Sequence, residues 1–170
     1  MPSPMRALLK RFSIVLLGLI SLHCSASTMT VQADRDQQVD FKRYRTFAWR
    51  EGAGNRVPEN LDRIVRREVE RELLARGYAK ADGGKPDLLV SYQGGVEEQT
   101  VWQPTRVGQY GGMSVRPMTV REGMLLLEFL DSATGQTVWV GSAQDNVGEK
   151  VTGEKIPRAV AEILKTFPRR

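Results

Sequence analysis

The stretch Thr119 to Val147, TVREGMLLLEFLDSATGQTVWVGSAQDNV, decides the fold. Its two β-prone halves are joined by Ser132 to Gly135, a short link whose glycine can take the positive φ of a tight turn. The pattern therefore predicts an antiparallel hairpin. In the first half, Met124 to Leu127 is apolar on both sides of the strand, which is typical of a central strand covered on at least one face by helices.

Two amphipathic helices are expected to pack against this hairpin. The first follows the glycine-rich turn Glu51 to Pro58, is capped by Asn60 and ends at Gly77, which can adopt the left-handed conformation. The second has Pro157 in its first turn and ends before Pro168. Apolar residues recur every three or four positions in both helices: Leu61, Ile64, Val65, Val69, Leu73 and Leu74 in the first, and Ile156, Val160, Ile163, Leu164 and Phe167 in the second.

Three further strands are predicted from runs of β-branched and aromatic residues: Met29 to Ala33, Thr46 to Trp49, and Asp87 to Tyr92. The third is expected to extend toward Trp102 past Gly94 and Gly95, a pair that indicates a bulge or a close approach of two backbones. The next stretch, Gln103 to Pro117, contains glycines and prolines and follows neither period. We expect it to be a long loop.

The order of elements is strand, strand, helix, strand, strand, strand, helix. Each helix needs an apolar surface, and one sheet can supply it. The sequence therefore predicts an α+β two-layer sandwich, with a mostly antiparallel sheet of four or five strands and two amphipathic helices. A split arrangement with one helix on each face is the alternative. Residues 27–170 are expected to form a single domain.

The first 26 residues are typical of an export signal. A positive start, Arg6, Lys10 and Arg11, precedes Phe12 to Leu22, an uncharged apolar run of 11 residues. That run suits a secretory signal peptide and is too short for a membrane-spanning helix, which needs about 20 residues. We therefore expect residues 1–26 to be a signal peptide, of lipoprotein or ordinary type, and the rest of the chain to be exported.

Two modes of processing remain open. Cys24 directly follows the apolar run, where the lipid-modified residue of a bacterial lipoprotein would stand, although His23 replaces the usual small residue before it. Alternatively, cleavage after Ala26 would release a soluble protein that starts at Ser27. The first mode, slightly favoured, would hold the domain at the periplasmic face of a bacterial membrane, with the outer membrane preferred. The second would leave it in the periplasm.

Composition excludes some classes of function. Three of the 25 basic residues lie in the signal and none of the 20 acidic residues do, so the mature chain carries a net charge of only +2. Nucleic-acid binding is not expected, because it needs a basic stripe. The arginines between Arg63 and Arg71 alternate with acidic residues and indicate a solvated helix face. Cys24 is the only cysteine, so no intrachain disulfide can form.

Catalytic chemistry is restricted as well. The single histidine, His23, lies in the signal, so the mature domain lacks the imidazole of nucleophilic triads and of histidine-bound zinc. No cofactor or metal is expected. A pair of carboxylates could still cleave glycans. The candidates are Asp87, Glu97, Glu98, Glu122 and Glu128. Glu97 and Glu98 are neighbours on a strand and point to opposite faces, and Glu128 is best interpreted as a structural carboxylate.

Apolar residues around the predicted loop suggest a contact surface. Trp102, Tyr110, Met113 and Met118 could together form an adaptable apolar patch for a partner protein in the envelope. Trp49 and Trp139 lie in strands and are expected to belong to the core.

Several landmarks occur together in order. They are Asp40-Phe41, Tyr44 to Trp49, Gly77-Tyr78, Pro86 to Tyr92, Glu122-Gly123, Asp131, Thr134-Gly135, Val138-Trp139, Gly141 to Ala143 and Phe167-Pro168. Over residues 29 to 168 the chain thus resembles the bacterial family called domain of unknown function 4136. The resemblance implies an exported protein, often a lipoprotein, with an α/β fold and no assigned activity. It transfers no catalytic residue.

Three hypotheses of function follow. The first is a non-enzymatic binding or scaffolding module of the cell envelope, attached to a membrane surface if Cys24 is acylated. The second is a carboxylate-based hydrolase of envelope glycans, which requires a cleft with two carboxyl groups roughly 5 to 9.5 Å apart. The third is a carrier of a small lipophilic ligand, which requires an apolar cavity of at least about 300 Å³.

Overall fold

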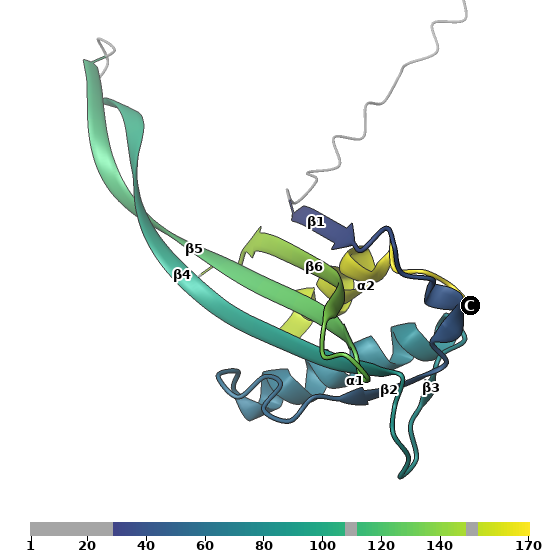
Figure 1. Cartoon of the computed structure of the whole chain (residues 1–170). Coiled ribbons are helices and arrows are strands. Elements are labelled where there is room, and N and C mark those ends of the chain that lie inside the picture. Colours follow the sequence, from purple (N-terminus) through teal and green to yellow (C-terminus); the bar gives the residue numbers. More distant parts are fainter. Residues whose placement is uncertain (1–28, 108–111, 149–152) are drawn as a thin grey trace, which may run out of the picture.

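The computed structural model describes residues 29–107, 112–148 and 153–170, and within them the chain forms one six-stranded sheet and two α-helices (Figure 1). The strands lie in the order β1-β6-β5-β4-β2-β3. Their bounds are β1 Thr30–Arg35, β2 Thr46–Trp49, β3 Ala79–Lys80, β4 Leu88–Val107, β5 Gly112–Asp131 and β6 Thr137–Asn146. The helices are α1 Glu59–Ala75 and α2 Ile156–Leu164, with short 3-10 turns at Phe41–Arg43 and Gly153–Lys155.

The mixed α+β class is confirmed, but the expected four or five strands were too few. The additional strand is β3, which has two residues and pairs in parallel with β2. Two residues are too few to produce a periodic signal in a sequence, so only the pairing identifies this strand. Strands β1, β6, β5 and β4 pair antiparallel, whereas β2 runs parallel to β4.

The predicted hairpin forms as expected. β5 and β6 pair antiparallel, Gly135 takes a φ of 71° in the turn, and β5 lies between β4 and β6 at the centre of the sheet. One face of these strands carries the largest buried side chains: Leu88, Val90 and Tyr92 of β4, Leu127 and Phe129 of β5, and Trp139 of β6. The expected core position of Trp139 is confirmed, whereas Trp49 is half-buried at the edge of the core.

Both helices contact that face and each other. Helix α2 approaches β6 at Gly141, where a Cβ atom would lie only 2.3 Å from Cη2 of Trp139 and 2.7 Å from Cγ2 of Ile163. Helix α1 contacts the sheet through Asp62, which accepts a hydrogen bond from the hydroxyl of Tyr92. The glycine at position 141 is therefore what lets α2 lie against the sheet.

The start of α1 differs from the expectation. The helix begins at Glu59, so Asn60 lies inside its first turn and is not the cap. Pro58 takes the cap position, where no side chain bonds to the first turn, and its carbonyl accepts from the N–H groups of Leu61 and Asp62 at 2.9 Å. The fixed φ of proline suits a helix start and explains the shift. At the other end, Gly77 has a φ of 91°, as predicted for the residue that ends the helix.

The stretch expected to be a long loop is instead mostly strand. β4 and β5 stay paired from Leu88 and Asp131 out to Val107 and Gly112. β2 pairs only as far as Val90, and β6 only as far as Glu122. Beyond those points β4 and β5 continue as a two-stranded ribbon, residues 97–107 and 112–121, which we call the arm. Figure 1 shows the arm curving away from the rest of the sheet.

The prediction of a loop was wrong, and two of the prolines that suggested it lie within paired strands. Pro104 is paired with Val115, and Pro117 with Trp102. Both strands of the arm are edge strands, so alternate N–H groups face solvent, and proline is tolerated at those positions because no ladder bond is lost. The prolines therefore lie at the exposed edges of the ribbon and do not interrupt the strands.

Candidate functional site

The arm carries an exposed apolar patch. In the strand register Trp102, Arg106, Met113 and Val115 share one face, with the two prolines between them. The exposed fraction is 67% for Trp102, 78% for Met113 and 61% for Val115. We call Trp102, Met113 and Val115 the arm patch. It continues the face that the helices cover in the body of the sheet, so it is an apolar sheet face without a covering helix.

The predicted contact residues are only partly brought together. Met118 pairs with Val101 and therefore lies on the opposite face of the arm from Trp102 and Met113. Tyr110 and Cys24 lie outside the described residues. Val115 was missed, although its alternation with Met113 and Pro117 is the period-2 pattern that would have revealed a strand.

The acidic residues of the arm, Glu97 and Glu98, lie at its base. No acidic residue occurs from Gln99 to Arg121, and the arm holds three arginines in that range. Arg121 pairs with Glu98 at its base, at 2.9 Å. Arg106 and Arg116 are exposed farther out and lie on opposite faces. The arm is therefore both apolar and basic.

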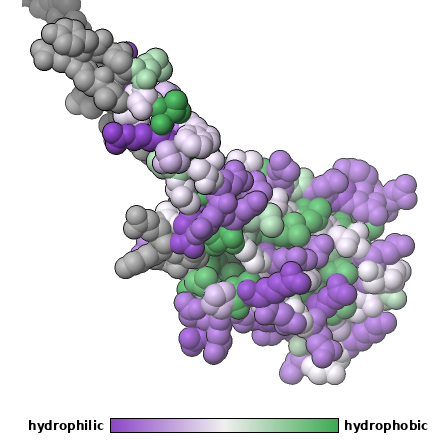
Figure 2. Space-filling view, turned by 90° about the vertical axis from the view of Figure 1, so that its left-hand side faces the viewer, coloured by the Kyte–Doolittle hydropathy of each residue, from purple (hydrophilic) through white to green (hydrophobic). Residues whose placement is uncertain are grey.

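An apolar pocket of about 270 Å³ lies beside the base of the arm. Figure 2 shows hydrophobic atoms gathered in a hollow of this side of the molecule. Its lining includes Val57 and Leu61 from the start of α1, Tyr92, Leu125 and Ala143 from the sheet, and Ile156 from α2. Gly94 allows this packing, because a Cβ there would lie 3.2 Å from Cγ2 of Val57. The register is unbroken across Gly94 and Gly95, so the double glycine is not a bulge. The close approach is at Gly94 alone, since a Cβ at Gly95 would meet nothing within 4 Å.

The rim of the pocket holds one carboxylate. Among the described residues that line it, only Asp145 is acidic, and Lys155 pairs with it at 2.9 Å. The pair of carboxyl groups that glycan hydrolysis needs is therefore not found in this pocket.

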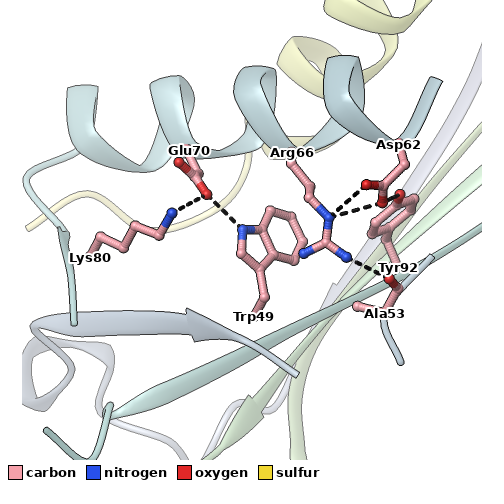
Figure 3. Close-up of polar contacts among 7 residues, drawn as sticks. All are labelled: Trp49, Ala53, Asp62, Arg66, Glu70, Lys80 and Tyr92. Atoms are coloured by element: carbon pink, nitrogen blue, oxygen red, sulfur yellow. Dashed lines mark hydrogen bonds and ion pairs between the residues drawn. The ribbon is translucent and has the colours of Figure 1, made fainter. Parts of the chain in front are cut away.

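A polar cluster joins α1 to the sheet on the side where Tyr92 lines the pocket (Figure 3). The guanidinium of Arg66 donates to both oxygens of Asp62, at 2.9 and 3.0 Å, and to the carbonyl of Ala53 at 2.7 Å. It also lies 4.7 Å from the ring centroid of Trp49. One side chain thus holds the helix, the turn before it and β2 together.

The second half of the cluster centres on Glu70. Its Oε1 accepts from Nε1 of Trp49 at 2.7 Å and from Nζ of Lys80 at 2.8 Å. Burial acts to raise the pKa of Glu70, but the hydrogen bonds from Lys80 and Trp49 outweigh it and lower the pKa. Burial raises the pKa of Tyr92, and the hydrogen bond to Asp62 raises it further. Both shifts lead away from neutrality, where a general acid or base should titrate.

Two carboxylates organise turns. Asp87 accepts from the backbone N–H groups of Arg45 and Thr46, at 2.8 and 2.9 Å, and these bonds lower its pKa. Asp131, which the sequence marked as a family landmark but not as a candidate carboxylate, is 3% exposed. Its burial acts to raise its pKa, but hydrogen bonds from the N–H groups of Thr134 and Ala133 and from the side chains of Tyr44 and Arg43 lower it to about 2. Both residues therefore have structural roles.

The other candidate carboxylates lie on strands. Glu97 is opposite Glu122 and Glu98 is opposite Arg121, so the expected opposite orientation of Glu97 and Glu98 is confirmed. Glu128 is half-buried opposite Ser91. Within the described parts of the chain, no three His, Cys, Asp or Glu side chains form a group that could hold a metal ion, and no helix is long and apolar enough to cross a bilayer.

The family can now be stated. The model of the domain of unknown function DUF4136 matches residues 31–169, which is most of the chain. The chain belongs to the DUF4136 family. No curated protein matches it. The DUF4136 family name assigns no activity.

Solved structures show that this DUF4136 fold occurs elsewhere. A PDZ domain protein from Parabacteroides distasonis is similar, with a TM-score of 0.60, 17% identity and coverage of 82% of this chain and 36% of that one. The chain thus spans about a third of that protein. The PelC dodecamer from Paraburkholderia phytofirmans is similar with a TM-score of 0.53, 14% identity and coverage of 84% and 99%. At these identities the likeness concerns the fold alone.

Proposed function

We propose that this chain is an exported, non-enzymatic binding or scaffolding module of the cell envelope, held at a membrane surface by an acyl group on Cys24, with the arm patch as its contact surface. The observation that carries the proposal is the arm. A ribbon that leaves the body of the sheet and exposes tryptophan, methionine and valine on one face has no packing role in the monomer, and such patches are typical of interaction sites.

The chemistry of the body supports a non-enzymatic role. The pocket has a single, paired carboxylate among its described lining residues, and the pKa of Tyr92, which also lines it, is raised away from neutral pH. The similar PelC fold is described as a dodecamer. A fold that assembles in that protein supports the scaffolding part of the proposal here.

The anchor is tested by the intact mass of the mature protein isolated from its host. We expect an acylated Cys24 and recovery with the membranes. Cys24→Ala is the matched control, because it keeps a small residue two positions before Ala26 and so preserves the ordinary cleavage site. This variant should leave the membranes after a wash in about 1 M salt, where the Debye length is only about 3 Å. A wild-type mass that begins at an unmodified Ser27 would refute the anchor.

The contact surface is tested by thiol labelling. Cys24 is the only cysteine and is acylated or removed, so Val115→Cys introduces the only free thiol. In permeabilised cells we expect a hydrophilic maleimide to label Val115→Cys at least about tenfold more slowly than it labels the purified protein in detergent. Leu74→Cys is the control, because Leu74 is 55% exposed on α1, away from the arm. Equal labelling of both variants in cells would contradict the proposal.

The pocket favours a second candidate, a carrier of a small lipophilic ligand. The supporting observation is its apolar lining, whereas its volume of about 270 Å³ falls short of the required size of about 300 Å³. Native mass spectrometry of the protein from its host should then show a bound apolar molecule. Ala143→Leu, which places three more carbons in the pocket, should remove it. A wild-type protein isolated without a ligand would contradict the carrier function.

A further inference from the structure

The composition of the arm identifies a partner. We propose that the arm patch lies on a phospholipid bilayer that carries anionic headgroups. The inference rests on the proposed function, because it names what the same contact surface touches, and three independent observations support it: the direction of the arm, its charge and its exposed side chains.

The first observation is where the chain enters the sheet. Thr30 is paired with Gln144, Gln144 with Met124, and Met124 with Gly95. β1 is antiparallel to β6, which is antiparallel to β5, so β1 and β5 run in the same direction. β5 starts at the outer end of the arm. The first residue of β1 therefore lies at the end of the sheet from which the arm projects, as Figure 1 also shows.

Chain length then limits how far the body can stand from a membrane. Cys24 is six residues before Thr30, and a fully extended chain covers at most about 3.5 Å per residue, or about 20 Å. From Gly95 to Val107, β4 has twelve further residues, which at about 3.3 Å each extend about 40 Å. The arm is therefore longer than the segment that joins Cys24 to Thr30. An acyl anchor on Cys24 thus keeps the bilayer close enough for the arm to reach it.

The second observation is charge. The arm has two acidic residues, Glu97 and Glu98, at its base, where Glu98 pairs with Arg121. Beyond them, from Gln99 to Val120, it carries two arginines and no acidic residue, whereas residues 27–170 as a whole are close to neutral. Arg106 and Arg116 are exposed on opposite faces of the ribbon. Basic side chains next to a membrane are attracted to the phosphates of anionic lipids. The arm is thus complementary in charge to such a surface.

The third observation is the arm patch itself. Tryptophan is enriched where proteins meet the headgroup region, since its ring is apolar and its N–H is polar. Trp102 is exposed next to Val115 and Met113, with Arg106 on the same face. An apolar strip with an adjacent arginine matches the order of acyl chains and phosphates at a bilayer surface.

The experiment uses the unacylated mature protein, obtained with Cys24→Ala, so that binding does not depend on the anchor. It is sedimented with vesicles of phosphatidylethanolamine and phosphatidylglycerol, and with vesicles of phosphatidylcholine alone. We expect binding to the anionic vesicles, at least about tenfold weaker binding to the neutral ones, and weakening by salt.

Two double variants separate the arm from general charge. Arg106→Glu with Arg116→Glu should weaken binding to the anionic vesicles at least about tenfold. Arg50→Glu with Arg63→Glu makes the same change in net charge at exposed residues outside the arm, and should weaken binding far less. Equal loss in both variants, or no binding by the parent protein, would overturn the proposal.

Fluorescence reports whether the patch itself touches lipid. Trp139 is buried and Trp49 is half-buried, so a blue shift of emission on vesicle binding comes from Trp102. Trp102→Phe should abolish the shift. Binding without a shift in the parent protein would contradict contact by the patch.

If the arm patch contacts something other than a bilayer, these experiments give different results. If the lipid-free protein is an oligomer that Val115→Glu dissociates, the arm covers a second copy and the proposal is wrong. If Val115→Cys is protected in cells while the protein ignores anionic vesicles, the contact surface stands but its partner is a protein. A mature protein without acyl groups removes the anchor and the distance argument, while the vesicle result still decides whether the arm binds lipid.

Discussion

At the scale of single residues, close packing makes one strand glycine indispensable. Gly141 lies where β6 meets α2, and its missing Cβ leaves room for the ring of Trp139 and for Ile163. Gly95 is also in a strand, but a Cβ there would meet nothing within 4 Å. Two glycines with similar backbone conformations thus differ in what surrounds them.

Gly141→Ala should therefore lower the free energy of unfolding by about 1 to 3 kcal/mol, the usual cost of inserting a methyl group into a packed core. Gly95→Ala should change it by less than about 0.5 kcal/mol, as surface substitutions usually do. Urea unfolding of both variants measures the difference. Equal effects would mean that α2 does not pack on Gly141 as described.

Asp131 is the carboxylate with the strongest native interactions. Its folded pKa of about 2 is below the ordinary aspartate value of 3.8, so ionised Asp131 stabilises the fold above about pH 4. That stability is lost as the pH falls from about 4 toward 2, because the carboxylate must then be protonated.

Asp131→Asn should destabilise the protein at pH 7 by about 1 to 3 kcal/mol, the cost of leaving buried donors without their charged acceptor. It should also flatten the pH dependence of stability between pH 4 and pH 2, approximately. Asp82→Asn, in the exposed turn before β4, is the control and should leave the pH profile unchanged. Denaturant unfolding at a series of pH values distinguishes the two.

At the scale of elements, the arm and the body of β4 and β5 are one pair of strands in two environments. In the body, β5 has a neighbour on each side and helices on one face. In the arm each strand has only the other. Two-stranded ribbons are marginally stable in water, so the arm should open without unfolding of the rest.

Hydrogen exchange should show this difference along the same strands. Paired amides between residues 99 and 106 should exchange at least about tenfold faster than those between 88 and 92. The measurement is exchange followed residue by residue by NMR. Uniform protection along β4 would mean that the arm is covered in the free protein.

At the scale of the whole molecule, the core lies entirely in the body. The cluster of buried apolar residues runs from Phe41 to Phe167 and includes no residue of the arm. The aromatic ring of Phe167, after the end of α2, packs on Phe129 and Trp139 and closes the core. The arm therefore contributes exposed surface but no side chain to the core that unfolds cooperatively.

Replacing residues 99–120 by Asn-Gly should preserve the fold. Such a two-residue turn suits a hairpin closed after Glu98 and before Arg121, a pair that stays intact. We expect one cooperative thermal transition with a Tm within about 5 °C of the parent protein, together with loss of the contact made by Val115. Calorimetry tests this, and a Tm lower by tens of degrees would show that the arm supports the core.

Features that depend on residues close together in the sequence could be predicted, and features that depend on distant residues could not. Helix α1, the turn at Gly135 and the hairpin of β5 and β6 follow from periodicity and local conformational preference, and all three were predicted. The cap at Pro58, strand β3 and the separation of Met118 from Trp102 were not predicted. They depend on how the chain enters a helix, on a partner strand and on register.

The sequence by itself determined the class of fold, the family, the central strand and the near-neutral charge of residues 27–170, because these depend on composition and on contacts between near neighbours. Only the tertiary structure decided that residues 103–107 and 112–117 form a paired ribbon and not a loop, and that Trp102, Met113 and Val115 share one face of it. Pairing over such distances leaves no period in a sequence that prolines and glycines interrupt, and it becomes visible only when the two strands lie side by side.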